Sequence, residues 1–170
     1  MIDKIFIKHS YDSKEYSEVA VWCNENNATI EDMGEYYKVV RKTIDKIKEN
    51  KLNEIDSWTE KKIIGGFTST CTGEKILYDS DKETQLTMQG IALAMNNGAF
   101  MKNFPTGCQV RGYPEGGNAK QIYLLTPEQI ILWLADLYIH IQTCKQLGWE
   151  KQIAVNNAKT IDDINNIVLE

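Results

Sequence analysis

The N-terminal stretch of the chain combines a strand-like pattern with a helical one. Apolar and polar residues alternate loosely over residues 2–7, and residues 13–27 place apolar side chains at helical spacing. Residues 28–40 then read as two short strands on either side of Asp32, Met33 and Gly34, with β-favouring Tyr36, Tyr37, Val39 and Val40 in the second strand. The pattern predicts a small strand–helix–hairpin head over residues 1–40.

The next segment, residues 41–65, is predicted to be a long and mostly polar helix. Its few apolar residues form a narrow stripe with a period close to the 3.5 residues of a coiled coil. The stripe consists of Ile44, Ile47, Leu52, Ile55, Trp58 and Ile63. So narrow a stripe is typical of a connecting or self-associating helix. We expect its members, apart from Leu52 and Ile63, to form part of an interaction surface.

Residues 66–170 predict a body in which hairpins alternate with helices. The first predicted hairpin consists of residues 67–71 and 75–78 and turns at Thr72 and Gly73, and the helix after it stops at Asn96, Asn97 and Gly98. A second hairpin follows over residues 108–126, and then a helix up to Leu147 that Gly148 stops. The last helix is capped by Thr160, with Asp163 three positions later. The fold class is therefore α+β: a head, a connecting helix, and a body of two hairpins and two to three helices.

The helix that begins after Thr126 is apolar on nearly its whole circumference. Its start is marked by Thr126 as N-cap, Pro127 at the first helical position and Gln129 completing a capping box. A helix this apolar is either enclosed by its own domain or covered by a partner. With few other helices available to enclose it, we favour an association surface over a central core helix. The residues expected on that surface are Trp133, Leu137 and Tyr138.

The segment ILYDSDKE, residues 76–83, has two interpretations. A strand followed by Asp79 and Asp81 is how some metal-dependent phosphatases present a nucleophile and a general acid. That chemistry needs a repeated parallel sheet, whereas this chain predicts hairpins. The alternative is a helix start, with Ser80 as N-cap, Glu83 closing a capping box and Asp81 near the positive helix end. We predict the helix start and no catalytic residue.

Length and charge narrow the classes of function. The chain has 170 residues, 42% of them hydrophobic, and a net charge of -5. No cluster of Lys and Arg interleaves with aromatic residues, so we expect no nucleic-acid partner. The longest apolar run, residues 130–139, contains Asp136 and is too short to span a bilayer, so we expect no membrane partner. Charges near the N-terminus argue against a signal peptide, which predicts a protein made in the cytoplasm.

The cysteines and histidines offer little for metal chemistry. Cys23, Cys71, Cys108 and Cys144 are far apart, and only two histidines accompany them. Zinc sites usually draw at least two ligands from close spacing. We therefore expect reduced thiols, no metal and no cofactor. Cys144 follows His140 by four positions on one helical face, and we expect a core pair there rather than a nucleophile and its base.

Two stretches of the chain resemble a known family. The sequence GGFTSTCTGEKILYDSDKETQLTMQGIALAM, followed by YLLTPEQIILWLADLYIHIQTC, is similar to an uncharacterised domain of tail-fibre and other tail-associated proteins of tailed phages and prophages. The matching positions are Gly66, Phe67, Tyr78, Asp79, Ser80, Asp81, Gln89, Gly90, Leu125, Thr126 and Gln129. The resemblance covers about residues 64–150, and the head resembles the short module that often precedes this domain. It implies no enzymatic residues.

The resemblance implies a structural component of a phage or prophage tail, associated with the fibre or the baseplate. Such a component is made in the host cytoplasm, assembled into the virion tail, and acts through contacts with other tail proteins or in a homo-oligomer. Two alternatives remain open: a tail-fibre assembly chaperone and a phage-encoded inhibitor of a host defence protein. The enzyme alternative is a metal-dependent phosphotransferase that uses Asp79 and Asp81.

Overall fold

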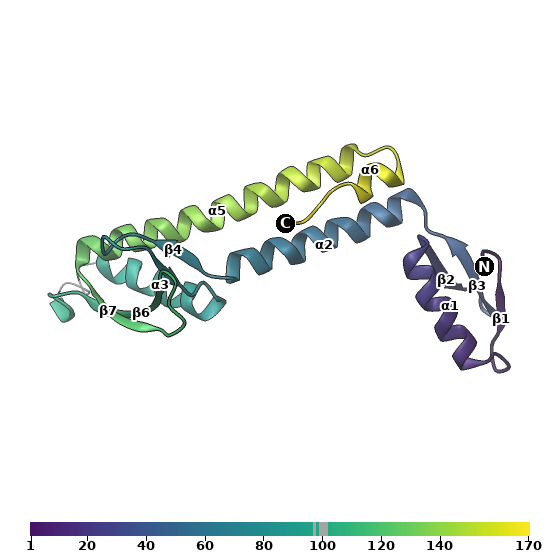
Figure 1. The fold of residues 1–170 in the computed structure, drawn as a ribbon, viewed down its shortest axis with the longest axis horizontal. Coiled ribbons are helices and arrows are strands. Elements are labelled where there is room, and N and C mark those ends of the chain that lie inside the picture. The colour runs from purple at the N-terminus through teal and green to yellow at the C-terminus, as the bar shows by residue number, and fades with distance from the viewer. Residues whose placement is uncertain (97, 99–101) are drawn as a thin grey trace. The chain divides into compact units, whose positions relative to one another are not determined.

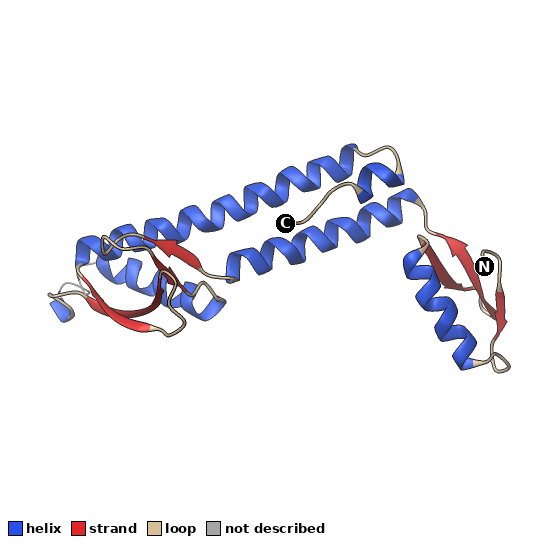
Figure 2. Cartoon of the chain, viewed as in Figure 1, coloured by secondary structure: helices blue, strands red, loops and turns tan. Residues whose placement is uncertain are grey.

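The computed structural model describes residues 1–96, 98 and 102–170 and has the α+β fold class that the pattern predicts. Figure 2 shows the helices and the two small sheets, which come from different parts of the chain. Internal contacts divide the chain into two compact units. Unit 1 contains Met1–Asn53 and Ala154–Val168 with Glu170, and unit 2 contains Glu54–Ile153 with Leu169.

The head belongs to unit 1 and is a three-stranded antiparallel sheet with one helix against it (Figure 1). Its elements are β1 (Ile5–Ile7), α1 (Ser13–Glu25), β2 (Ala28–Asp32) and β3 (Tyr36–Arg41), and the strand order is β1-β3-β2. Phe6, Val19, Cys23, Ala28 and Val39 form its buried cluster. Asp12 caps α1 by accepting a hydrogen bond from the N–H of Lys14 at 2.7 Å. The predicted strand, helix and hairpin are confirmed.

Unit 1 also joins the start of one helix to the C-terminal segment. The helices concerned are α2 (Ile44–Ile64) and the short α6 (Ile161–Asn165). Ile47 is buried in a cluster with Ala158 and Ile164, and the Lys48 ammonium donates to the carbonyl of Asn156 at 2.9 Å. The long polar helix predicted after the head is thus confirmed as α2, and its first turns are covered by residues more than a hundred positions later.

The last helix begins as its sequence predicts. The side chain of Thr160 accepts a hydrogen bond from the N–H of Asp163 at 3.1 Å, and the Asp163 carboxylate accepts one from the N–H of Thr160 at 2.9 Å. This reciprocal pair is a capping box. It fixes the start of α6 and so the position of Ile164, which is buried.

Unit 2 is built on a four-stranded antiparallel sheet. The strands are β4 (Phe67–Ser69), β5 (Ile76–Tyr78), β6 (Cys108–Pro114) and β7 (Gln121–Leu125), and each pairs with the next along the chain. Both predicted hairpins are therefore confirmed. Gly112 lies opposite Tyr78 in the β5–β6 pair. A Cβ at Gly112 would lie 2.5 Å from the side chain of Ile76, so only glycine lets these two strands pair with their large side chains inward.

Two helices pack against this sheet and close the main core. They are α3 (Lys82–Asn96) and α5 (Pro127–Asn157). The core consists of Phe67, Cys71, Ile76, Tyr78, Met88, Leu125, Ile130, Trp133 and Leu137. The predicted end of α3 at Asn96 is confirmed, while Asn97 of the expected stop signal lies outside the described residues.

The helix α5 does not stop at Leu147 as predicted, because Gly148 has a packing role instead. The helix continues to Asn157. A Cβ on Gly148 would lie 2.4 Å from the Thr59 hydroxyl oxygen of α2, which allows no side chain there. Close approach of the two helices thus outweighs the cost of about 1 kcal/mol that glycine brings to a helix interior.

Within unit 2, α2 and α5 run antiparallel along each other. Their contacts pair Ile63 with His140, Thr59 with Gly148 and Asp56 with Gln152. The Gln152 amide donates to the Asp56 carboxylate at 2.6 Å. Among the helices in the described ranges, none combines the length and the hydrophobicity that a membrane span requires.

Candidate functional site

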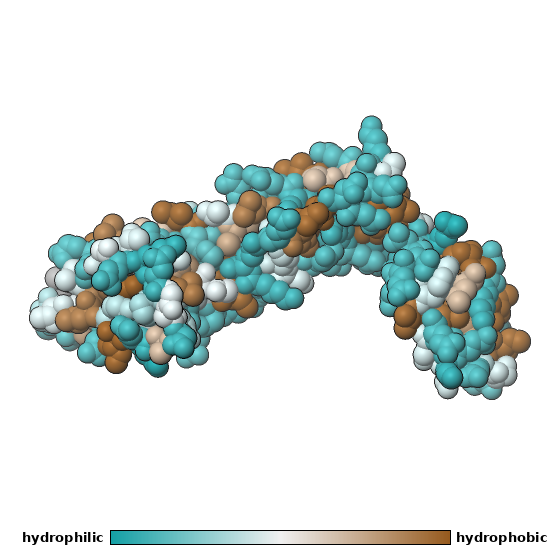
Figure 3. Space-filling model, in the orientation of Figure 1, coloured by the Kyte–Doolittle hydropathy of each residue, from teal (hydrophilic) through white to brown (hydrophobic). Residues whose placement is uncertain are grey.

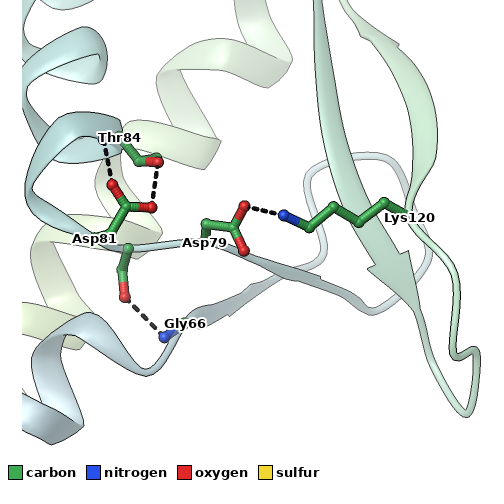
Figure 4. A network of polar contacts seen from close by, with 6 residues as sticks. Gly66, Asp79, Asp81, Thr84 and Lys120 are labelled. Atoms are coloured by element: carbon green, nitrogen blue, oxygen red, sulfur yellow. Dashed lines mark hydrogen bonds and ion pairs between the residues drawn. The ribbon is translucent and has the colours of Figure 1, made fainter.

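The two carboxylates after β5 bind different partners, as Figure 4 shows. Asp81 is the N-cap of α3: its side chain accepts hydrogen bonds from the backbone N–H and the hydroxyl of Thr84, both at 2.9 Å. These hydrogen bonds lower the pKa of Asp81 from its ordinary value. A carboxylate used in this way stabilises the helix start and has both oxygens occupied.

Asp79 lies on the other side of the same turn and forms an ion pair with Lys120, between β6 and β7. Its hydrogen bond to the Lys120 ammonium raises the pKa of that lysine. The two carboxylates therefore do not converge on one point. In the described residues, no group of three or more His, Cys, Asp and Glu side chains is arranged to hold a metal ion.

Ser80 is not the N-cap, and the predicted capping box with Glu83 is wrong. Its side chain is buried and points away from the helix start. The hydroxyl donates to the carbonyl of Ile63 and accepts a hydrogen bond from the N–H of Gly66 at 2.8 Å. The physical reason is the period of two in the strand: the alternation that buries Ile76 and Tyr78 carries Ser80 inward too. Glu83 lies exposed in the first turn of α3.

The carbonyl of Ile63 is the centre of a joint between three segments. It belongs to the last turn of α2, where backbone carbonyls have no partner within the helix. The Ser80 hydroxyl donates to it, and the His140 imidazole of α5 lies 3.2 Å from it. Gly66, with φ of +100°, then turns the chain from α2 into β4. We call this group, Ile63, Gly66, Ser80 and His140, the α2 joint.

The His140 and Cys144 pair lies in the core, as predicted. Cys144 is buried, its sulfur is 3.8 Å from the His140 ring, and burial raises its pKa. A raised pKa disfavours the thiolate that a nucleophile needs. All four cysteines are free thiols.

The capping box predicted at Thr126 and Gln129 is confirmed. The Gln129 side chain accepts a hydrogen bond from the N–H of Thr126 at 2.9 Å, and the Thr126 hydroxyl accepts one from the N–H of Gln129 at 3.3 Å. The Glu128 carboxylate also accepts from the Thr126 hydroxyl at 2.9 Å. These bonds fix the first turn of α5 directly after β7.

Most residues expected on an interaction surface are instead buried within the chain. Ile47, Ile55, Trp133 and Leu137 are each less than 8% exposed. Ile44 and Trp58 are half-buried, and the ammonium groups of Lys62 and Lys151 lie over the Trp58 ring. The narrow stripe of α2 is therefore covered by the chain's own C-terminal segments. Of the seven residues, only Tyr138 is exposed, at 65%, and its place in an interaction surface stays a prediction.

Apart from Tyr138, the large apolar residues of α5 that are more than half exposed are not the ones expected on the surface. They are Ile131, Leu132, Tyr138, Ile139, Trp149 and Ile153. Figure 3 shows hydrophobic side chains reaching the surface among hydrophilic ones. We call these six residues the outer face of α5. Its spacing is visible in the sequence, but in a helix with apolar residues all round, the sequence does not tell which side meets the core.

A comparison with family models places most of this architecture in one family. Residues 46–168, well over half of the chain, match the model described as Domain of unknown function (DUF4376). The chain belongs to the DUF4376 family. Comparisons with curated proteins and with solved structures give no match.

The DUF4376 match begins inside α2 and ends after α6. It therefore contains the four-stranded sheet, the α2 joint and the outer face of α5, while the head precedes it. Residues 64–150, which carry the resemblance seen in the sequence, lie inside the DUF4376 range. Several of the resembling positions, Gly66, Ser80 and Asp81 among them, meet at the α2 joint and the start of α3.

Proposed function

We propose that this DUF4376 protein is a non-enzymatic structural component of a phage or prophage tail, associated with the fibre or the baseplate and acting by protein–protein contacts. The observation that carries the proposal is the outer face of α5. Single exposed hydrophobic residues are common on soluble proteins, but six large ones along one helix indicate a surface that a partner covers.

The outer face is suited to a permanent contact because it is rigid. The capping box at Thr126 and Gln129 holds one end of α5 to the sheet, and the contact at Gly148 holds the helix against α2. A face on a fixed helix loses little conformational freedom on binding, so a larger part of its apolar burial contributes to affinity. This favours a structural contact over a transient one.

The tail assignment is supported by the sequence resemblance, whose positions include Gly66 and Ser80 of the α2 joint. The enzyme alternative has less support, because Asp79 and Asp81 are each engaged by another group. Both carboxylates have roles in holding β5, α3 and the β6–β7 hairpin in place.

The experiment is quantitative mass spectrometry of purified phage particles from the host that carries the gene. We expect the chain in the particles at a fixed ratio to the other tail proteins. If it is abundant in the infected cell but missing from finished particles, the structural role is wrong and the assembly-chaperone role follows. If it copurifies with neither particles nor their precursors, the tail proposal is wrong altogether.

The contribution of the outer face can be measured in the same particles. A variant with Ile131→Glu and Tyr138→Glu should fold, because both side chains are exposed, and should be incorporated far less than wild type. Leu86→Glu is the matched control, since Leu86 is an exposed apolar residue on α3, 69% accessible. Equal loss of incorporation in the control would show that the outer face has no special role.

A further inference from the structure

The side of α5 opposite its buried residues has the residue spacing of a coiled-coil seam. Starting at Leu132, positions three and four residues apart alternate without interruption up to Ile153. The seven positions are Leu132, Ala135, Ile139, Gln142, Gln146, Trp149 and Ile153. All are exposed except Gln142, which is half-buried. Three heptads of this kind are the pattern by which two helices pack side by side.

The seam is separate from the packing that already holds α5. Inside unit 2, the helix uses Ile130, Trp133, Leu137, Cys144 and Gly148 toward the sheet and α2. Gly148 and Gln146 differ by two positions, about 200° around the helix. The two stripes therefore lie on opposite sides of the helix, and the seam meets the internal packing only at Trp149, which with Lys145 borders a pocket lined by Thr59 and Glu60 of α2. Trp149 is still 54% exposed, so the seam can accept another helix.

The middle of the seam is polar, and this restricts what can cover it. Gln142 and Gln146 occupy consecutive seam positions, with three apolar positions before them and two after them. A glutamine buried against an apolar side chain loses its hydrogen bonds to water, whereas a glutamine facing another glutamine can replace them. The best partner therefore carries polar residues opposite Gln142 and Gln146. A second copy of this helix, parallel and in register, places its own Gln142 and Gln146 there.

The charges beside the seam favour the same partner. In a parallel coiled coil, the residue directly before the first seam position of a heptad lies beside the seam. It faces the residue five positions later in the sequence on the other helix. Lys145 and Glu150 occupy these two places and are both exposed. In a parallel, in-register pair of copies, each Lys145 would face Glu150 of the second copy. Within one helix, residues five apart do not face each other, so Lys145 and Glu150 can pair only between chains. Inside the chain, the Glu150 carboxylate accepts a hydrogen bond from the Gln146 amide at 3.3 Å, and Lys145 borders a pocket lined by Asp56 and Glu60.

We propose that the seam of α5 binds a second copy of this chain in parallel and in register. This inference rests on the proposed role of the outer face in protein–protein contact and names its partner. Leu132, Ile139, Trp149 and Ile153 form the apolar layers, Gln142 and Gln146 form the polar ones, and Lys145 pairs with Glu150 of the other copy.

The association is tested with the purified full chain by light scattering and sedimentation over a range of concentrations. Wild type should self-associate, and Ile139→Glu should weaken the association by roughly tenfold or more, because it places a charge in an apolar layer. Leu86→Glu is the control and should associate like wild type. A wild-type chain that stays monomeric at near-millimolar concentration would overturn the proposal.

Orientation is tested by exchanging the two charges. Lys145→Glu and Glu150→Lys should each weaken association, because each faces like charges in a parallel pair, and the double variant should restore it. An antiparallel pair would not bring these two residues together, so a double variant no better than the single ones would overturn the parallel arrangement. Circular dichroism confirms that each variant keeps its helices.

These results are separable from the test of tail function. A monomeric chain that is nevertheless present in particles would remove the self-association and keep the tail role. A self-associating chain that is missing from particles and their precursors would keep the seam and remove the tail role.

Discussion

Ser80 shows how one small side chain can hold several segments of unit 2. Its hydroxyl joins the carbonyl of Ile63 at the end of α2 to the N–H of Gly66 at the start of β4. The side chain is buried, and its removal takes the acceptor from the Gly66 N–H and leaves the Ile63 carbonyl with His140 alone. A buried polar group that loses its partner costs about 1–3 kcal/mol.

Replacing Ser80 by Ala is therefore expected to lower the free energy of unfolding by about 1–3 kcal/mol. Urea denaturation followed by circular dichroism measures the change. Ser17→Ala is the control, because the Ser17 hydroxyl is bonded to the carbonyl of Ser13 on the exposed side of α1. If both variants were equally stable, the α2 joint would not depend on this hydroxyl.

Asp81 should make stability depend on pH in a defined direction. The hydrogen bonds from Thr84 lower its pKa in the folded chain below the ordinary 3.8. Because the pKa of Asp81 is lower in the folded chain than in the unfolded chain, its carboxylate contributes fully to folding stability above the unfolded pKa. That contribution is lost as the pH falls through the folded pKa. Asp81→Asn keeps a capping oxygen but does not titrate at this position.

The measurement is the melting temperature of wild type and Asp81→Asn at several pH values. The melting temperature of wild type should exceed that of Asp81→Asn by the largest amount above about pH 5. The two melting temperatures should converge in acid, below the folded pKa of Asp81. Comparing the two chains at each pH cancels the titration of the other carboxylates. A difference that grows as the solution is acidified would contradict the assigned cap.

Asp79 and Asp81 together give a direct test of the alternative that they form the metal site of a phosphotransferase. The double variant Asp79→Asn and Asp81→Asn is expected to show the same response to magnesium and manganese as wild type, namely none. The reason is that Lys120 and Thr84 already engage the two side chains. Isothermal titration calorimetry checks this, and heat of binding that only wild type releases would revive the phosphotransferase.

At the scale of the elements, the contact between α2 and α5 depends on a glycine. A methyl group at Gly148 would overlap the Thr59 hydroxyl, which lies 2.4 Å from the position of the missing Cβ. Overpacking of this kind costs about 1–3 kcal/mol, against a gain of about 1 kcal/mol in helix propensity. Gly148→Ala should therefore destabilise the chain although alanine is the better helix former.

A second substitution tells whether Thr59 is the cause. Thr59→Ala removes the overlapping hydroxyl, so the double variant with Gly148→Ala should recover most of the lost stability. Chemical denaturation of the four chains gives the coupling between the two sites. If Gly148→Ala alone were more stable than wild type, glycine would not be required at this helix contact.

The elements that the sequence predicts correctly are those with local signals. The hairpins and the starts of α5 and α6 depend on turn residues and caps within a few positions of each other. The errors have distant causes. The sequence predicts that Gly148 ends a helix. Its actual role is to let α5 approach α2, and this depends on Thr59, some ninety positions earlier. Ser80 and Asp81 are both good caps, and only the partner at Ile63 decides between them.

The surface of α5 was harder to predict for a related reason. A narrow apolar stripe, as in α2, shows which side of the helix is buried, but not whether the residues that cover it come from the same chain. In a helix that is apolar all round, the sequence does not show which side is buried. The burial of Trp133 and the exposure of Ile139 follow from where the sheet lies, and that depends on residues far away along the chain.

At the scale of the whole molecule, unit 1 draws residues from both ends of the chain. The cluster of Ile47, Ala158 and Ile164 ties the start of α2 to the last helix. Ile164 is 1% exposed. Replacing it by Ala should cost about 2–5 kcal/mol locally, since three buried side-chain carbons are lost and a cavity remains.

Hydrogen exchange followed by mass spectrometry can localise that loss. With Ile164→Ala, exchange should accelerate in residues 44–53 and 154–168, while the sheet of unit 2 keeps its protection. Val168→Ala is the control, because Val168 is an exposed residue of the same C-terminal segment. Equal acceleration throughout the chain would mean that the two units unfold as one.

The capping box at Thr126 and Gln129 also determines the rotational phase of α5. Because the first turn is tied to β7, one inserted residue in the helix would turn everything after it by about 100°. The contact at Gly148 and the outer seam would then both point the wrong way. Seven inserted residues leave the phase within about 20°. Natural length variants of this helix should therefore differ in steps of about seven residues, and seldom in single ones.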